Sequence, residues 1–249
     1  MKLDNVIATR STKTVYRDGD KVIKLFNADY KKSDVFNEAL NQARIEETGL
    51  LIPKVIEVTK IEDRWALVSE YIEGTTLEEL MKKHPEKEAE YLDLFVELQL
   101  KVHTMKAPHL NKLKDKMMRK VAEADVSPAT RYNLHTAIEG MHSHDKVCHG
   151  DFNPSNIVIK EDGQAYILDW AHAAQGNASA DAARTYLVFA LNKQQDLGDK
   201  YLKIFCEKSG INKVYVQKWL PIVAAAQSLL NIPEEKEILS KWIDVVDYE

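Results

Sequence analysis

The stretch from His149 to Trp170 constrains the fold of this chain more than any other part of the sequence. Two short apolar runs flank Asp162-Gly163, a dipeptide that favours the tight turn of a two-residue β-hairpin. If Asp162 and Gly163 form that loop, Asn156 and Asp169 become directly opposed partners at the open end of the hairpin. Directly opposed Cβ atoms lie about 4.5–5.5 Å apart. The sequence therefore predicts a polar pair at this end.

These polar residues predict a metal and phosphate site. An amide oxygen and a carboxylate at that separation can share a hard cation such as Mg²⁺, so Asn156 and Asp169 are predicted metal ligands. Asp151 lies five residues before Asn156, and we expect it to accept a proton from a hydroxyl or to orient that hydroxyl. Taken singly, each residue is more simply explained as a turn residue, whereas their combined spacing favours the site.

The same residues carry a family resemblance. His149, Asp151 and Asn156 form a His-Gly-Asp-x-x-x-x-Asn pattern, and Leu168-Asp169-Trp170 follows the hairpin. This order and spacing resemble the catalytic loop and metal-binding motif of the aminoglycoside phosphotransferase and choline kinase superfamily, relatives of the protein kinases. Downstream, residues 180–184 (Ala-Asp-Ala-Ala-Arg) resemble the Asp-x-x-Arg segment of that superfamily.

The resemblance implies ATP- and Mg²⁺-dependent transfer of the γ-phosphoryl group to a hydroxyl of a small molecule. An aminoglycoside, a choline-like amine, an amino alcohol or a sugar would all be suitable acceptors. It also implies a catalytic role for Asp151, with His149 holding the loop backbone. A protein-kinase-like activity and a non-catalytic nucleotide-binding module remain alternatives. The short interval from Asp169 to Asp181 disfavours the first, and the presence of Asp151 disfavours the second.

The first 75 residues read as strand-rich. Asp18-Gly19 and Glu62-Asp63 each separate two runs of strand-forming residues and predict two hairpins, the second joining 54–60 to 65–71. Between them, helical spacing of apolar residues predicts one helix over 34–48, capped by Ser33 and ended by Gly49. The predicted buried face of this helix contains Val35, Phe36, Ala39, Leu40 and Ala43.

By resemblance, residues 22–25 form the strand that carries the phosphate-binding lysine of kinases. Strand alternation places Lys24 among apolar neighbours, where a lysine either extends to solvent or is paired. We expect Glu38 on the following helix as its partner, with Glu46 as the second choice.

The resemblance also places adenine-binding backbone groups in residues 68–74, which include Glu70 and Ile72. The stretch that would cover the phosphates in kinases, residues 9–13, contains no glycine. Ser11 and Thr12 are the candidates for this role, through their hydroxyls or backbone N–H groups.

After residue 75 the pattern becomes helical. Thr76 with Glu79 predicts a capped short helix, and Ser127-Pro128 predicts the start of another. The predicted fold class is α+β, a two-lobed protein-kinase-like architecture. Its nucleotide-binding lobe, an antiparallel sheet with one helix, spans residues 1–72, and its helical catalytic lobe spans residues 73–249.

Composition excludes several other classes. The net charge of −5 lacks the basic excess of a nucleic-acid-binding domain. The sequence shows neither a signal peptide nor an apolar run long enough to span a bilayer. With only Cys148 and Cys206, a disulfide framework is not expected, and a cytoplasmic location fits best. We therefore expect a small-molecule partner, without nucleic acid or membrane.

Weaker patterns suggest other sites. His142, His144, Cys148 and His149 are metal-binding residue types, but their spacing matches no zinc motif. Trp219, Trp242, Tyr186 and Tyr215 could enclose a quaternary amine, although helical aromatics more often belong to a core. The acidic residues Glu234, Glu235, Glu237, Asp244, Asp247 and Glu249 could attract a cationic substrate, although exposed charge is the simpler explanation.

Overall fold

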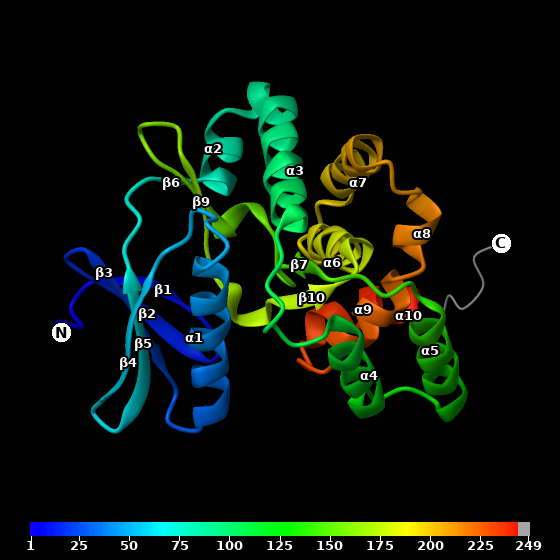
Figure 1. The fold of residues 1–249 in the computed structure, drawn as a ribbon, viewed down its shortest axis with the longest axis horizontal. Coiled ribbons are helices and arrows are strands. Elements are labelled where there is room, and N and C mark those ends of the chain that lie inside the picture. Colours follow the sequence, from blue (N-terminus) through cyan, green and yellow to red (C-terminus); the bar gives the residue numbers. More distant parts are fainter. Residues whose placement is uncertain (244–249) are drawn as a thin grey trace. The chain divides into compact units, whose positions relative to one another are not determined.

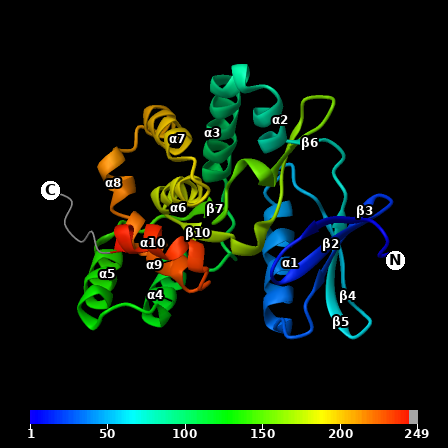
Figure 2. The ribbon, with the colours of Figure 1, turned by 180° about the vertical axis from the view of Figure 1, so that it is seen from behind.

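The structure, a computed structural model, describes residues 1–243 and divides into two compact units (Figures 1 and 2). The first unit contains residues 1–85 and 154–173, and the second contains residues 86–153 and the chain from 174 onward. The hairpin of the sequence motif thus belongs to the first unit. The predicted lobes, residues 1–72 and 73–249, are a functional division of the chain. This division stays a prediction.

The first unit is built on a five-stranded antiparallel sheet with the order β1-β2-β3-β5-β4. Its elements are β1 (Val6–Thr9), β2 (Lys13–Asp18), β3 (Lys21–Phe26), α1 (Lys32–Glu46), β4 (Val55–Ile61) and β5 (Arg64–Glu70). Figure 1 shows α1 running beside this sheet. The predicted α+β class, with one helix on an antiparallel sheet, is confirmed.

Both predicted N-terminal hairpins are present. Glu62 and Asp63 have φ values of 49° and 62°, which the two-residue turn between β4 and β5 requires. In the first hairpin Asp18 pairs with Lys21, so the loop consists of Gly19 and Asp20, one residue later than predicted. Gly19 alone takes a positive φ, 62°, as a glycine does at the first loop position of a type II′ turn.

Strand alternation sorts the core of the first unit onto two faces of the sheet. Ile23 and Leu25 pack with Ala66 and Val68 on one face. On the opposite face Phe26 and Leu67 pack with Val35 and Ala39 of α1. Because side chains alternate along a strand, Lys24 shares the α1 face with Phe26.

The start of α1 differs from the prediction. The helix begins at Lys32, after Lys31, and no side chain caps it. Ser33 is therefore inside the first turn. Gly49 lies just beyond the last turn, where its N–H donates to the carbonyl of Glu46 and its φ is 78°.

The predicted buried face of α1 is partly wrong. Phe36 and Leu40 are 45% and 48% exposed, whereas Glu38, Asn41 and Gln42 are buried. The polar side chains are buried because they find partners. Gln42 Nε2 donates to the carbonyl of Pro53 across 2.6 Å, for example. Hydrogen bonds thus take the place of apolar contacts along this face.

The remainder of the first unit is a short helix and a three-stranded sheet of order β6-β8-β9. These elements are β6 (Thr75–Thr76), α2 (Leu77–Lys83), β8 (Ile157–Ile159) and β9 (Ala165–Ile167). Thr76 caps α2 as predicted, because its hydroxyl accepts from the N–H of Glu79. A single 3₁₀ turn, η2 (Pro154–Asn156), precedes β8, and another, η3 (Trp170–His172), follows β9.

The second unit is largely helical, as predicted for the chain after residue 75. Its elements are α3 (Glu88–Thr104), α4 (Leu113–Glu123), α5 (Pro128–Gly140), β7 (Lys146–Cys148), β10 (Ala174–Gly176), α6 (Ala178–Leu191), α7 (Gln195–Ser209), α8 (Lys213–Gln217), α9 (Leu220–Ser228) and α10 (Lys236–Ile243). Ser127 caps α5 as predicted. In its core Phe95 of α3 contacts the rings of Phe152, Phe189 and Tyr201. Among residues 1–243, no helix is long and apolar enough to cross a membrane.

Candidate active site

Four charged side chains meet in the first unit. Lys24 Nζ lies 2.6 Å from Glu38 Oε1 and 3.1 Å from Asp169 Oδ1. Lys13 Nζ lies 3.2 Å from Glu38 Oε1 and 3.7 Å from Asp169 Oδ2. Two ammonium groups and two carboxylates thus alternate in one network, which we call the Lys24 cluster. Three of its side chains are almost fully buried, whereas that of Asp169 is 33% exposed.

Three elements position this cluster. Lys13 on β2 lies beside Phe26, which is two residues from Lys24 on β3, so both lysines project from the same face of the sheet. Glu38 is on the buried face of α1. Asn41, one turn further along α1, donates from Nδ2 to the carbonyl of Ala171 across 3.2 Å, which ties the helix to the segment carrying Asp169.

The backbone of Asp169 is left-handed, with φ 60° and ψ 69°. Asp and Asn adopt this conformation more readily than other residues with a side chain. The next residue, Trp170, is fully buried and donates from Nε1 to the carbonyl of Ile167 across 3.0 Å. The chain is therefore anchored directly after Asp169.

Electrostatics keep both members of the central ion pair charged. Burial by itself would raise the pKa of Asp169, but the charges of Lys24 and Lys13 lower it below its ordinary value. Burial would likewise lower the pKa of Lys24, but Asp169 and Glu38 raise it above its ordinary value. Asp169 is thus ionised at neutral pH, which is the form that binds a hard cation.

The predicted opposition of Asn156 and Asp169 is wrong by one residue. Ile157 pairs with Ile167, and the N–H of Leu168 donates to the carbonyl of Asn156 across 2.8 Å. The hairpin loop has three residues, ending at Gly163 with φ 80°, because a type I turn followed by a left-handed glycine competes with the two-residue turn. Asn156 therefore faces Leu168, and Asp169 lies one position further along.

Asp181 organises the predicted catalytic loop in the second unit. Its Oδ1 accepts from the N–H of Gly150 across 2.7 Å, and its Oδ2 accepts from the N–H of His149 across 3.2 Å. His103 Nε2 lies 2.9 Å from the same Oδ2. Burial would raise the pKa of Asp181, but the hydrogen bond and charge of His103 outweigh it and lower that pKa.

His149 is fully buried, and its Nδ1 accepts from the N–H of Asp151 across 3.2 Å. Asp151 itself is half-buried. Its Oδ1 lies 3.3 Å from Nη2 of Arg184, and its Oδ2 accepts from Asn153 Nδ2 across 3.3 Å. The Asp-x-x-Arg segment near the start of α6 thus holds the loop at two points. Asp181 binds its backbone N–H groups, and Arg184 binds the carboxylate of Asp151.

The other predicted nucleotide-binding residues make local contacts. Ser11 and Thr12 are exposed, and their carbonyls accept hydrogen bonds from Asn27. Glu70 at the end of β5 accepts from the N–H of Lys54 across 3.1 Å, and Ile72 is half-buried two residues later. Glu46, the second-choice partner of Lys24, instead accepts from the N–H of Val55 across 2.7 Å.

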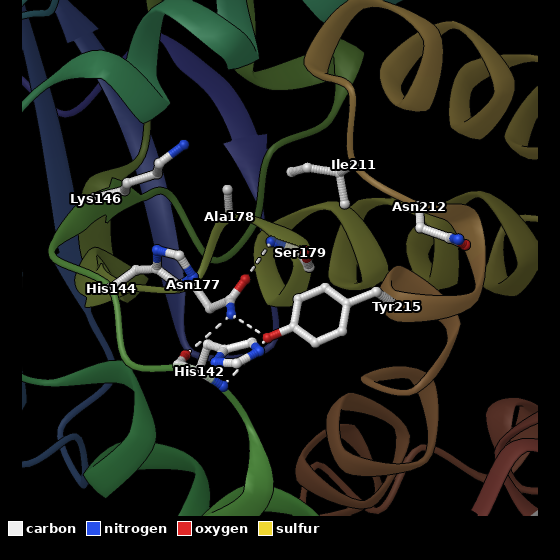
Figure 3. A pocket seen from close by; sticks show the side chains of 9 residues that line it. All are labelled: His142, His144, Lys146, Asn177, Ala178, Ser179, Ile211, Asn212 and Tyr215. Carbon is white, nitrogen blue, oxygen red and sulfur yellow. Dashed lines mark hydrogen bonds between the residues drawn. The ribbon is translucent and has the colours of Figure 1, made fainter.

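A hollow of about 360 Å³ in the second unit is lined by two of the four residues considered for zinc (Figure 3). His142 and His144 line it together with Lys146 and Tyr215. Cys148 is buried outside this lining, and burial raises the pKa of its thiol. Within residues 1–243, no group of three or more His, Cys, Asp or Glu side chains is arranged to hold a metal ion.

The aromatic residues considered for an amine-binding site and the acidic residues considered for a cationic substrate make separate contacts in the structure. Tyr186 packs against Trp242, whereas the hydroxyl of Tyr215 accepts from Asn177 across 2.8 Å (Figure 3). Trp219 is buried. Glu235 accepts from Gln227 across 2.7 Å and Glu237 pairs with Lys241. Asp244, Asp247 and Glu249 lie outside the described residues.

Sequence reasoning did not single out Lys13, His103 or Arg184 as site residues. Lys13 carried a usable signal, since both the predicted Asp18-Gly19 loop and the observed loop one residue later place Lys13 on the same face of the sheet as Lys24. His103 carried none, because it is 78 residues from Asp181 in the sequence. Arg184 was part of a motif without an assigned contact.

Solved structures of other proteins share the fold of this chain. A thermostable mutant of aminoglycoside phosphotransferase APH(4)-Ia in its apo form is 14% identical, with a TM-score of 0.71, and the match covers 97% of this chain and 92% of that chain. Choline kinase LicA from Streptococcus pneumoniae is 16% identical, with a TM-score of 0.62, and the match covers 95% of this chain and 86% of that chain. The kinase-like fold is thereby confirmed.

A family model decides the assignment. The phosphotransferase enzyme family matches residues 7–215, which include the Lys24 cluster, the catalytic loop and Arg184. The chain belongs to this family of phosphotransferases. No curated protein matches the sequence.

Proposed function

We propose that this phosphotransferase uses ATP and Mg²⁺ to phosphorylate a hydroxyl group of a small molecule. The Lys24 cluster is the observation that carries this proposal. A lysine held between a helix glutamate and a metal-binding aspartate is the arrangement that kinases use to bind nucleotide phosphates. A thermostable APH(4)-Ia mutant, 13% identical with a TM-score of 0.70 over 97% of this chain and 92% of that chain, has been solved with AMP-PNP and hygromycin B, which supports a nucleotide and a small-molecule substrate here.

Lys24 contacts the α- and β-phosphates of ATP in this proposal, and Glu38 orients it. Lys13 adds a second ammonium group to the same cluster. The two lysines supply the ammonium groups that face the phosphates in this proposal, and within the cluster their charge is balanced by Glu38 and Asp169. The backbone at Glu70 and Ile72 binds the adenine, and Ser11 and Thr12 cover the phosphates.

Asp169 and Asn156 would hold Mg²⁺. Their donor atoms fit this ion, because carboxylate and amide oxygens are the ligands that hard cations take. The carboxylate of Asp169 is also ionised and partly open to solvent. Bound Mg²⁺ neutralises charge on the nucleotide phosphates.

Asp151 positions the acceptor hydroxyl and accepts its proton. Phosphoryl transfer passes through a loose transition state, so most of the catalysis comes from positioning and charge neutralisation. The backbone bonds of Asp181 and His149 fix the loop, and the Arg184 guanidinium fixes one carboxylate oxygen of Asp151. His149 is therefore a positioning residue.

A two-stage experiment tests this function. Thermal shift with ATP and Mg²⁺ measures nucleotide binding, and mass spectrometry then measures phosphoryl transfer to a panel of hydroxylated amines, sugars and hydroxy acids. We expect Asp169→Asn to lose Mg²⁺-dependent ATP binding and Asp151→Asn to keep that binding while losing transfer. Unchanged transfer by Asp169→Asn with an accepted substrate would contradict the proposal.

The same experiment addresses the alternatives. A protein-kinase-like enzyme needs a segment after the metal-binding Asp that can act as an activation loop, but residues 170–180 are taken up by η3, β10 and the start of α6. Transfer to a peptide would revive that alternative, and nucleotide binding without any transfer would favour a binding module.

The two free cysteines support the cytoplasmic location that we propose for this enzyme.

A further inference from the structure

The hollow in the second unit is formed by three separate segments of the chain (Figure 3). Its volume of about 360 Å³ is within the range of small-molecule sites. One wall comes from residues 142–146, which end at the first residue of β7, and another from residues 177–179 at the start of α6. The third comes from the segment 211–215. The lining contains neither Asp151 nor its partner Arg184, so the hollow differs from the proposed acceptor site.

The hydroxyl of Tyr215 can only donate to a ligand in this hollow. Its oxygen accepts from Asn177 Nδ2 across 2.8 Å and from the N–H of His142 across 3.3 Å (Figure 3). A hydroxyl has two acceptor positions and one O–H donor, so both acceptor positions are taken. The O–H group has no acceptor among residues 1–243, and it is left for an acceptor atom from outside the chain.

Asn177 fixes this orientation of the Tyr215 hydroxyl. Its Nδ2 also donates to the carbonyl of His142 across 3.1 Å, and its Oδ1 accepts from the N–H of Ser179 across 2.9 Å. The amide of Asn177 is therefore satisfied within the chain and belongs to the wall. The hydroxyl of Ser179, by contrast, makes no hydrogen bond within residues 1–243, although Ser179 is 1% exposed and lines the hollow. A buried polar group without a partner is costly, so a ligand would stabilise it.

The lining is positively charged. Lys146 contributes an ammonium group that forms no ion pair with another described residue. His142 and His144 contribute imidazole rings, and no lining residue is Asp or Glu. Asp145, the carboxylate next to Lys146 in the sequence, pairs instead with Lys106 across 3.1 Å. A negative group from outside the chain would therefore be stabilised in the hollow.

The start of α6 adds to this positive field, and other lining groups are apolar. Ala178 and Ser179 are the first two residues of this 14-residue helix, and a helix N-terminus carries a partial positive charge that favours anions. Ile211 and the ring of Tyr215 supply apolar surface, and the Tyr215 ring centroid lies 5.9 Å from that of His142. An anion with an apolar body matches both parts of this lining.

We propose that the hollow binds a small organic anion, a carboxylate or phosphate ester whose apolar body packs against Ile211 and the Tyr215 ring. Lys146 supplies the attracting charge, and Tyr215 supplies a directed O–H donor, since charge-assisted hydrogen bonds are the strong ones. This site is additional to the proposed phosphotransferase site and does not depend on that reaction.

Two elements connect this anion site to the catalytic loop. β7 begins at Lys146 and leads into His149, and α6 begins at Ala178 and carries Asp181. Asp181 accepts from the N–H groups of His149 and Gly150. A ligand that contacts the start of both elements opposes local openings that separate them. At a ligand concentration of ten times Kd, such openings should become about tenfold rarer.

Matched compounds test the ligand class. Isothermal titration calorimetry of the full-length protein compares benzoate and phenyl phosphate with benzyl alcohol and benzylamine, which keep the ring and change the charge. Inorganic phosphate tests the anion without an apolar body. We expect both ring-bearing anions to bind, and the other three compounds to bind at least tenfold more weakly. Absent binding of both ring-bearing anions, or equal binding of any of the other three, would overturn the proposal.

Variants locate the binding site. Lys146→Met and Tyr215→Phe should each raise the Kd of benzoate about tenfold or more, as expected when one hydrogen bond to a charged group is lost. Lys218→Met and Tyr132→Phe make the same chemical changes at positions outside the lining and should leave the Kd unchanged. Thermal melts without ligand show that each variant is folded. Equal losses in the variants and their controls would overturn the assignment.

Nucleotide competition separates this site from the Lys24 cluster. Lys24→Met alters only the first unit, so it should retain benzoate binding, and ATP with Mg²⁺ should not displace benzoate. Loss of binding in Lys24→Met, or competition by ATP, would assign the anion to the Lys24 cluster and overturn the proposal. Benzoate binding without phosphoryl transfer to any acceptor would instead leave this site intact while the proposed function fails.

Hydrogen exchange tests the connection to the catalytic loop. Mass spectrometry follows peptides that cover residues 146–153, with and without benzoate at ten times its Kd. We expect exchange in these peptides to slow about tenfold, and Lys146→Met to abolish the effect at the same benzoate concentration. Slowing confined to the segment 211–215 would overturn the connection.

Discussion

The N–H of Gly150 donates to Oδ1 of Asp181 across 2.7 Å, so a buried carboxylate on α6 holds the backbone of the loop that carries Asp151. The same carboxylate accepts from His149 and His103. Asp181 therefore connects α3, α6 and the catalytic loop within the second unit.

Replacing Asp181 with Ala should destabilise the protein strongly. The change leaves the buried N–H of His149 and the partly buried N–H of Gly150 without their acceptor, and an unsatisfied buried group costs about 1–3 kcal/mol. We expect a loss of about 2–5 kcal/mol in the free energy of unfolding, measured by urea denaturation. Asp125→Ala, at an exposed position, is the control and should change the stability by less than about 0.5 kcal/mol. A loss below 1 kcal/mol for Asp181→Ala would contradict this role.

The two lysines of the Lys24 cluster should differ in their effect on activity. Lys24 contacts both carboxylates at 3.1 Å or less, whereas Lys13 reaches Asp169 only at 3.7 Å. We expect Lys24→Met to lower kcat about 10²–10³-fold, the usual effect of removing one charge-stabilising donor, and Lys13→Met to have a smaller effect. Steady-state kinetics with an accepted substrate measures both. Lys21→Met on the same strand is the control, and equal losses for Lys21 and Lys24 would refute the assignment.

Stability should depend on pH through Lys116. Burial, followed by the charge of Lys120, lowers its pKa to about 7 in the folded protein, whereas this pKa is near its ordinary value of about 10.5 when unfolded. The unfolded state therefore binds more protons between these values, and stability rises with pH across this window. Replacing Lys116 with Met should stabilise most below pH 7, and the gain should decline toward pH 10.5. Urea denaturation across this range measures the gain, and a flat profile equal to that of Arg119→Met, at an exposed position of the same helix, would disprove the shift.

Three glycines should respond differently to alanine. At Gly74 an added Cβ would collide with the backbone carbonyl of Ile159, so Gly74→Ala should lower stability by about 1–3 kcal/mol. Gly163 has open space but a φ of 80°, which costs an alanine about 1 kcal/mol. Gly140 has neither constraint, and Gly140→Ala should be neutral or stabilising by up to about 1 kcal/mol. The urea midpoint should be lowest for Gly74→Ala, intermediate for Gly163→Ala and highest for Gly140→Ala. A reversed ranking would show that the backbone of β8 at Ile159 moves to make room for the added Cβ.

Local signals predicted the elements of this fold because turns and caps depend on neighbouring residues. Glu62-Asp63 and Thr76 behave as their sequence context requires. The hairpin after Asn156 shows where such signals stop, since an Asp-Gly dipeptide suits loops of two or three residues and each gives a different register. The sequence alone does not decide between them.

The sequence predicted which motif residues form the candidate site, but it predicted fewer of the contacts between them. Lys24 meets Glu38 because strand alternation and helix spacing point both toward the same side of the sheet. The bonds of Asp181 to His103 and to the catalytic loop join segments that are far apart in the sequence. Only the packed second unit brings these segments together, so no local pattern reports them.

The polar inner face of α1 has a consequence for how this helix tolerates sequence change. Its exposed Leu40 and buried Asn41 reverse the usual rule that apolar positions are the restricted ones. In a saturation mutagenesis library selected for activity, we expect Leu40 to accept most residue types, whereas Glu38, Asn41 and Gln42 accept very few. Variation among natural sequences of this enzyme would follow the same order, with the exposed apolar positions Phe36 and Leu40 drifting and the buried charged and amide positions kept.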